Sequence, residues 1–144
     1  MSATGLASAR LSSFQPGDAL PERRRACDIV QSFFYNAALW NAHRIHYEMQ
    51  YAKQAEGYAG LVVPGPLLGD WLGQCAEDWA GDAGRVVKLS YSNRLAALVG
   101  EPLEIGGAVK AVDAAAREVE LELWVKNAGG EVITPGTARV RFAA

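Results

Sequence analysis

The sequence predicts an α+β domain in which an antiparallel β-sheet wraps around one long central helix. Three observations lead to this fold class: a heavy Leu/Trp stripe at helical spacing after residue 66, strict alternation over residues 118–126, and the order of short helices, one long helix and then strands. The sheet can bury the stripe of the helix on its apolar face. With 144 residues, half of them apolar, the chain amounts to one domain with a sizeable core.

The first half of the chain predicts small elements. Residues 1–13 are rich in Ser, Ala and Gly without a period, so we expect a flexible arm ahead of a domain at residues 14–144. Residues 26–31 predict a first strand, and a short helix follows from Ser32, as N-cap, to about Trp40. A second short helix is predicted at residues 49–56.

The long helix has the clearest signal. Pro66 suits a first helical position because its missing N–H needs no intrahelical partner there, and Gly81 marks the end. The apolar residues between them recur at steps of three and four, which is typical of a helix facing a core. These residues are Leu68, Trp71, Leu72, Cys75 and Trp79.

The second half predicts only strands, at residues 85–98, 102–112, 118–126 and 131–142. The first of them is long, and a bend or bulge is expected near Ser92 and Asn93. In the third, one face is apolar and the other acidic, as in an antiparallel strand with one wet face. Residues 127–130 read as a hairpin turn.

Composition excludes several classes of protein. A net charge of −2 shows no nucleic-acid footprint, and the run Arg23–Arg25 is better explained as a strand edge protected by charge. Cys27 and Cys75 are widely separated thiols, which favours small buried side chains in a reducing compartment. Neither a membrane-spanning run nor the apolar core of a signal peptide is present, so we expect a cytoplasmic protein.

The chemistry concentrates in the segment Asn41-Ala42-His43-Arg44-Ile45-His46-Tyr47-Glu48, which holds the two histidines of the chain. Histidine is the side chain whose ordinary pKa allows it both to accept and to donate a proton near neutral pH. The segment therefore predicts a catalytic site. The alternative is a capped loop whose histidines only bind neighbouring backbone.

This segment and a second one resemble the MaoC-like enoyl-thioester hydratases and dehydratases of the hotdog fold. The second segment is Tyr58-Ala59-Gly60-Leu61-Val62-Val63-Pro64-Gly65-Pro66-Leu67. Together they are most similar to the branch of type 2 hydroxyacyl-thioester dehydratases and mesaconyl-C4-CoA and itaconyl-CoA hydratases, over about residues 14–142. Three positions depart from the pattern: Asn41 replaces the Asp of the wider family, Pro64 the usual His, and Glu48 the usual Asp.

The resemblance implies a site. His46 would be the acid and base, and Asn41 would hold the water without taking its proton. The thioester carbonyl would meet the start of the long helix, where Gly65 and Leu67 keep their backbone donors and the two prolines do not.

Other residues of the polar segment have two interpretations. Arg44 either anchors the loop or binds the substrate, and Tyr47 either packs or lines the pocket. His43 is either structural or a residue that orients the loop. A metal bound by His43, His46 and Glu48 has no further ligand at a zinc-like spacing, so we expect neither metal nor cofactor.

The function that the resemblance implies is reversible hydration of an α,β-unsaturated acyl thioester, carried on CoA or on an acyl carrier protein. A small dicarboxylic acyl-CoA of the mesaconyl type is one such substrate. The alternatives are a hotdog thioesterase, which would need a carboxylate such as Asp70, Glu77 or Asp78 at its site, and a non-catalytic acyl-thioester-binding protein. Open sheet edges and a single set of strands predict a homodimer or a multiple of it.

Overall fold

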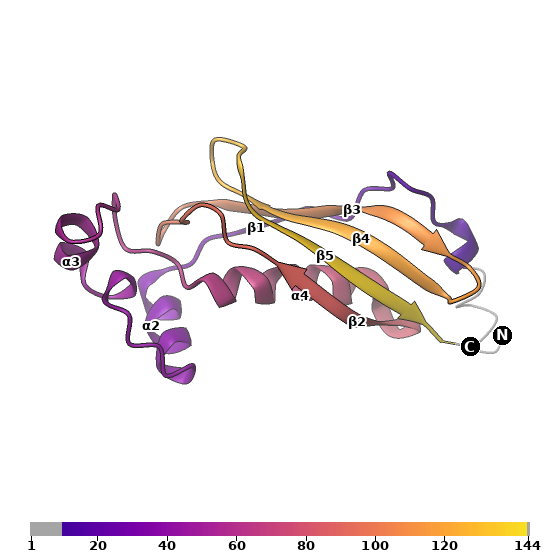
Figure 1. Ribbon diagram of the computed structural model, residues 1–144, viewed down its shortest axis with the longest axis horizontal. Coiled ribbons are helices and arrows are strands. Elements are labelled where there is room, and N and C mark those ends of the chain that lie inside the picture. The colour runs from indigo at the N-terminus through magenta and orange to yellow at the C-terminus, as the bar shows by residue number, and fades with distance from the viewer. Residues whose placement is uncertain (1–9, 144) are drawn as a thin grey trace.

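Five antiparallel strands form one sheet, and the long helix α4 lies along one face of it (Figure 1). The computed structural model describes residues 10–143. The strands are β1 (Arg23–Arg25), β2 (Gly84–Tyr91), β3 (Leu103–Asp113), β4 (Glu118–Lys126) and β5 (Val132–Phe142), in the order β1-β3-β4-β5-β2. The helices are α2 (Ile29–Ala38), α3 (Met49–Gln54) and α4 (Gly65–Ala80), with short 3-10 turns η1 (Arg44–His46) and η2 (Gly81–Ala83). The predicted hotdog fold is confirmed.

The central strands owe their pairing to alternation. Along β4 every second side chain is buried, and its partners on β5 across the buried face are also apolar: Val119 pairs with Val140, and Leu121 with Ala138. Such cross-strand apolar pairs are the units that stabilise a sheet. The acidic side chains of β4 point to the other face, where Lys110 binds Glu120. The predicted hairpin turn joins β4 to β5, with the N–H of Gly130 donated to the carbonyl of Asn127.

Helix α4 supplies the core that the sheet covers. Four of the five residues of the predicted stripe are buried, with Leu72 0% exposed, and Trp79 is partly buried. Gly136 of β5 lies directly opposite, because a Cβ at that glycine would be 2.9 Å from Cδ1 of Leu72. The helix begins at Gly65 with Pro66 in its first turn and ends before Gly81, which has a φ of 60°. The predicted boundaries therefore hold to within one or two residues.

The predicted strand at residues 26–31 is wrong. The first strand is β1, three residues earlier, and α2 already begins at Ile29. The reason is the N-cap: the Asp28 carboxylate accepts from the N–H of Gln31 at 2.7 Å, which starts the helix before Ser32. Ser32 is buried inside the helix and does not cap it. The run of three arginines does form an edge strand, as its charge indicated.

The long strand predicted at residues 85–98 ends at Tyr91. The following loop stays bonded to β5 as far as Leu95, whose N–H is donated to the carbonyl of Ile133 at 3.3 Å. It then turns to the segment that precedes α4, where the N–H of Val63 is donated to the carbonyl of Ala97 at 2.8 Å. An isolated bridge joins Val62 to Leu98. The β2–β3 loop is therefore held against the first turn of α4.

The flexible arm predicted at residues 1–13 falls mainly on residues 1–9, which lie outside the described part of the chain. Residues 10–13 are helical, and Leu11 is buried in the core. The Arg10 guanidinium donates to the carbonyls of Trp79 and Ala80, at the end of α4. The expectation of flexibility therefore does not extend to these four residues.

Both cysteines are free and buried. Burial raises the pKa of the Cys27 thiol to about 11, so it carries no thiolate at neutral pH. Within residues 10–143, no helix combines the length and the apolar character needed to cross a membrane.

Replacing Leu72 with alanine tests the packing of α4. The leucine is fully buried between the helix and the sheet, so we expect Leu72→Ala to lower the free energy of unfolding by about 2–5 kcal/mol in urea titrations. Gln74→Ala, at an exposed position of the same helix, should change it by less than about 0.5 kcal/mol. Equal effects of the two substitutions would contradict this account of the core.

Candidate active site

The polar segment lies between α2 and α3, beyond the end of the sheet where α4 begins (Figure 1). Two of its own side chains shape it. The Asn41 side-chain oxygen accepts from the N–H of His43 at 3.1 Å, and His43 is the N-cap of η1, with Nδ1 accepting from the N–H of Ile45 at 3.4 Å. The contacts of Asn41 and His43 are thus those of a capped loop.

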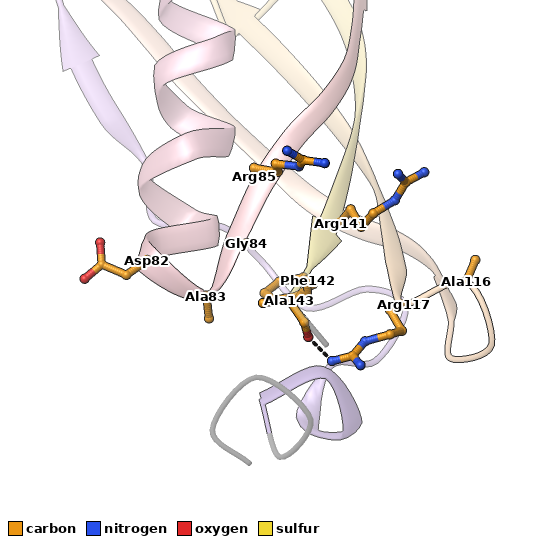
Figure 2. Close-up of a pocket in the computed structure, with 9 residues that line it drawn as sticks. All are labelled: Asp82, Ala83, Gly84, Arg85, Ala116, Arg117, Arg141, Phe142 and Ala143. Atoms are coloured by element: carbon orange, nitrogen blue, oxygen red, sulfur yellow. Dashed lines mark hydrogen bonds between the residues drawn. The ribbon is translucent and has the colours of Figure 1, made fainter. Parts of the chain in front are cut away.

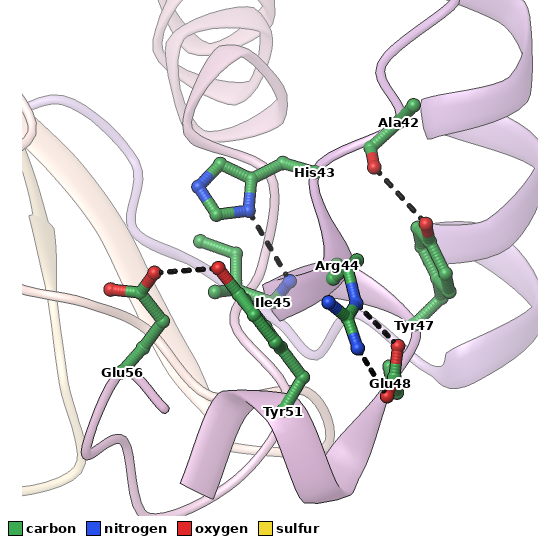
Figure 3. A network of polar contacts seen from close by, with 8 residues as sticks. All are labelled: Ala42, His43, Arg44, Ile45, Tyr47, Glu48, Tyr51 and Glu56. Atoms are coloured by element: carbon green, nitrogen blue, oxygen red, sulfur yellow. Dashed lines mark hydrogen bonds and ion pairs between the residues drawn. The ribbon is translucent and has the colours of Figure 1, made fainter. Parts of the chain in front are cut away.

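Arg44 and Tyr47 make contacts within the same segment (Figure 3). The Arg44 guanidinium donates twice to the Glu48 carboxylate, at 2.7 and 2.9 Å, and lies 4.1 Å over the ring of Tyr51. The hydroxyl of Tyr47 donates to the carbonyl of Ala42 at 3.1 Å. Of the two interpretations of Arg44, these contacts match the anchor of the loop.

His46 differs from its neighbours because it is buried, with only 6% of its surface exposed. Its Nδ1 lies 2.7 Å from the carbonyl oxygen of Val62. That oxygen can only accept, so the proton resides on Nδ1 and the lone pair on Nε2. Val62 is itself held in place, because its N–H is donated to the carbonyl of Ile45 at 3.0 Å. Both the tautomer and the ring orientation of His46 are therefore set by backbone.

Burial also decides the charge of His46. It lowers the pKa of the imidazole below its ordinary value, and the neighbouring His43 lowers it further, while the bond to Val62 acts in the opposite direction. The two imidazole rings are 5.9 Å apart. At neutral pH His46 is consequently a neutral base.

A cavity of about 250 Å³ connects His46 to the start of α4. Its lining is contributed by the polar segment, the loop before α4, the first turn of α4 and the β2–β3 loop, and includes His46, Tyr58, Val63, Gly65, Asn93 and Arg94. Gly65 is the first residue of α4, where backbone N–H groups have no partner within the helix. The N–H of Leu67, by contrast, is donated to the carbonyl of Pro64 at 3.0 Å.

Of the residues predicted for the site, the structure brings His46 and Gly65 together in this cavity. Asn41, Arg44, Tyr47 and Leu67 are not among the residues that line it. Asn93 and Arg94 do line it but were not predicted, since the sequence indicated only a bend there. No local pattern marks them: they reach the site because the β2–β3 loop folds back onto α4.

A second cavity, of about 510 Å³, lies at the other end of α4 (Figure 2). Three arginines line it, but Arg141 is bound to Glu118 and Arg117 donates to the carbonyl of Ala143. None of the predicted site residues is there. Among the described residues, no group of three His, Cys, Asp or Glu side chains has an arrangement that could hold a metal ion.

The fold and the buried histidine beside the first turn of α4 place the chain among the MaoC-like hotdog hydratases and dehydratases. The family model for hydroxyacyl-thioester dehydratase type 2 matches residues 8–99, and the chain belongs to this family.

Individual relatives support the assignment over short segments. A stretch of 36 residues is 58% identical to mesaconyl-C(4)-CoA hydratase of Chloroflexus aurantiacus and covers 25% of this chain and 13% of that protein. A stretch of 39 residues is 49% identical to the mitochondrial hydroxyacyl-thioester dehydratase type 2 of Schizosaccharomyces pombe and covers 27% of this chain and 13% of that protein. The matches thus span a small part of each relative.

The fold itself is similar over nearly the whole chain. The solved (R)-hydratase from A. caviae involved in PHA biosynthesis has a TM-score of 0.81 and 18% sequence identity, covering 91% of this chain and 98% of that one. At this identity the comparison shows the shared architecture.

The burial of His46 predicts how stability depends on pH. Since its folded pKa is below the unfolded value of about 6.5, the unfolded chain binds the proton more readily. The contribution of His46 to the free energy of unfolding is therefore complete above about pH 6.5, and it is lost as the pH falls through the folded pKa. Urea unfolding at a series of pH values should show this loss in the wild type and a smaller one in His46→Gln. An NMR titration of His46 with a midpoint at or above 6.5 would contradict the assignment.

Proposed function

We propose that the protein reversibly hydrates an α,β-unsaturated acyl thioester. The observation that carries this proposal is the position of His46: a neutral, buried base whose tautomer is set by backbone, in the same cavity as the first turn of α4. The reaction requires a base and a hydrogen-bond donor for the thioester oxygen, and the N–H of Gly65 at the start of α4 is such a donor. Membership of a family of hydroxyacyl-thioester dehydratases supports the same reaction.

In the hydration direction, Nε2 of His46 takes a proton from water while the oxygen forms a bond to the β-carbon. The π electrons of the double bond move toward the thioester carbonyl, whose oxygen becomes an enolate. The imidazolium of His46 then returns its proton to the α-carbon, and the carbonyl forms again. Atoms and charge balance with one side chain that acts first as base and then as acid. Dehydration is the same path in reverse.

The enolate oxygen is assigned to the start of α4. Gly65 has its N–H there and no side chain to obstruct the thioester, and the helix dipole favours negative charge at this end. Leu67 is a weaker candidate than the sequence indicated, because its N–H is already donated to Pro64. Gly65 is therefore the backbone donor in the proposed site.

Asn41 supports the base from the polar segment. An amide cannot take a proton, so all proton transfer falls to His46. The contact between Asn41 and the N–H of His43 holds the turn that carries His46, and we assign Arg44 and Tyr47 to the same supporting task.

The proposed substrate is a short enoyl thioester of CoA or of an acyl carrier protein, including the mesaconyl type. A cavity of about 250 Å³ matches a small acyl group better than a long one. Pro64 lies between Val63 and Gly65, which both line the cavity, and brings no polar side chain to this position. The thioesterase alternative has less support, because Asp70, Glu77 and Asp78 are on the exposed side of α4 and do not line the cavity.

The first test is His46→Ala. Removing the acid and base should lower kcat for hydration of crotonyl-CoA or mesaconyl-C4-CoA by about 10²–10⁴-fold. The rate of hydration is measured as the loss of enoyl absorbance. His43→Asn is the matched control: it removes the other imidazole, keeps a capping side chain, and should retain activity. Activity of His46→Ala above about a tenth of the wild type would refute the mechanism. Release of free thiol at constant enoyl absorbance would favour a thioesterase.

Two substitutions of Asn41 test whether this residue only orients the polar segment or takes part in proton transfer. Asn41→Asp keeps the oxygen that accepts from His43 and adds a base, so activity should stay the same or rise. Asn41→Ala loses that acceptor and should lower kcat. Both follow from steady-state kinetics with melting temperatures recorded in parallel. An inactive but equally stable Asp variant would mean that the neutral amide itself is required.

We also propose that the chain acts as a homodimer or a multiple of it. The edge strand β1 is three arginines long, whereas β2 runs for eight residues and leaves Val87, Leu89 and Tyr91 more than a third exposed. A long, partly apolar edge recruits another strand, and a two-fold axis satisfies both copies at once. Light scattering at micromolar concentration should give about twice the chain mass or more. A monodisperse monomer that hydrates enoyl-CoA would contradict this assembly.

A further inference from the structure

The side chain of Asn93 reaches the first turn of α4 from the β2–β3 loop. Asn93 belongs to the β2–β3 loop, 28 positions after Gly65 in the sequence, yet its amide is the group that faces this glycine. A Cβ added to Gly65 would lie 2.3 Å from Nδ2 of Asn93 and 3.2 Å from its Cγ. Both residues line the cavity that contains His46.

The orientation of this amide is set by a buried hydroxyl. Thr134 of β5 is 0% exposed, and its Oγ1 donates to Oδ1 of Asn93 at 3.0 Å. With Oδ1 occupied by Thr134, the Nδ2 end of the amide is the one turned toward Gly65. A donor is thereby presented to the start of α4.

The backbone on both sides of Asn93 is also held. The N–H of Ser92 is donated to the carbonyl of Pro135 at 3.1 Å, and the N–H of Arg94 to that of Ile133 at 2.9 Å. These bonds tie the loop to β5 immediately before and after Asn93. The side chain is therefore presented from a supported position, as a preorganised donor must be.

We propose that Asn93 is a substrate-binding residue whose Nδ2 donates a hydrogen bond to the thioester carbonyl oxygen, beside the N–H of Gly65. This inference rests on the proposed hydratase function and adds a side-chain donor to it. An amide is suited to this place because it donates without carrying charge, whereas a carboxylate would repel the developing enolate. It also explains why position 65 needs glycine: any side chain there would displace the amide.

A purely structural Asn93, joining β5 to the loop, is the competing explanation. It predicts that variants change stability and leave the chemistry of bound substrate unaltered. Asn93→Asp separates the two, because the carboxylate still accepts from Thr134 but has no N–H to offer. Asn93→Ala removes both contacts, and Ser92→Ala is the matched control in the same loop.

The kinetic test measures kcat and KM for crotonyl-CoA with these variants. Loss of one preorganised oxyanion donor lowers kcat by about 10²–10³-fold in comparable sites, so we expect a fall of this order in Asn93→Asp and Asn93→Ala. KM should change much less, and Ser92→Ala should match the wild type. Wild-type kcat in a folded Asn93→Asp would overturn the proposal.

A spectroscopic test does not require turnover. Butyryl-CoA labelled with ¹³C at its carbonyl has no double bond to hydrate, so its bound carbonyl stretch can be recorded by difference infrared spectroscopy. Hydrogen bonding should lower this frequency in the wild type, and Asn93→Ala should restore part of the shift. Thr134→Val, which releases the amide from its orienting partner, should restore a smaller part and serves if the Asn93 variants fail to fold. Identical band positions in the wild type and a folded variant would overturn the proposal.

The two arms keep the two hypotheses apart. A wild type that binds butyryl-CoA with a lowered carbonyl frequency but hydrates no enoyl-CoA refutes the proposed function. In that case the carbonyl frequencies of the wild type and the Asn93 variants still decide whether Asn93 binds the thioester. A wild type that hydrates enoyl-CoA, with Asn93→Asp equally fast, supports the function and refutes the role of Asn93.

Discussion

Burial of the apolar stripe of α4 against the sheet is the contact on which the rest of the structure depends. Exposing the stripe to water is unfavourable, and the sheet has one apolar face that can cover it. The free energy gained by burying both apolar surfaces therefore fixes the helix relative to the strands. Leu72 opposite Gly136 shows how close this approach is. Once α4 lies on the sheet, its first turn projects at one end, and the loops before and after it must pass around that point.

The site is a consequence of that passage. The segment before α4 provides the Val62 carbonyl that holds His46, and the same segment binds the β2–β3 loop through Val63 and Ala97. His46 is thus oriented by backbone, and Asn93 by the buried hydroxyl of Thr134. Such orientation costs no reorganisation at the moment of reaction, which is the general source of electrostatic stabilisation in enzymes.

The groups assigned to the proposed reaction are neutral before it begins. Burial keeps the proton off Nε2 of His46, and Asn41 carries a neutral amide. The charged pair Arg44 and Glu48 compensates itself outside the cavity. In the proposed site, negative charge that develops on the thioester oxygen therefore meets the donors of Gly65 and Asn93, and no carboxylate is among the described residues that line the cavity.

Periodicity by itself determined the elements that one face of the chain defines: α4 from its stripe, β4 from its alternation, and the hairpin from its glycines. The polar segment of eight residues likewise made His46 a candidate acid and base, because the ionisable side chains are visible in the sequence itself. The strand predicted at residues 26–31 was wrong, because a short apolar alternation is typical of a strand. The Asp28 cap, which starts a helix at Ile29, is evident only in the structure. The tertiary structure alone decided that His46 is buried and neutral and that Asn93 reaches Gly65. It also showed that the N–H of Leu67 is already donated to the carbonyl of Pro64. These depend on contacts between segments far apart in sequence, and no local pattern encodes which loops meet at the end of a helix.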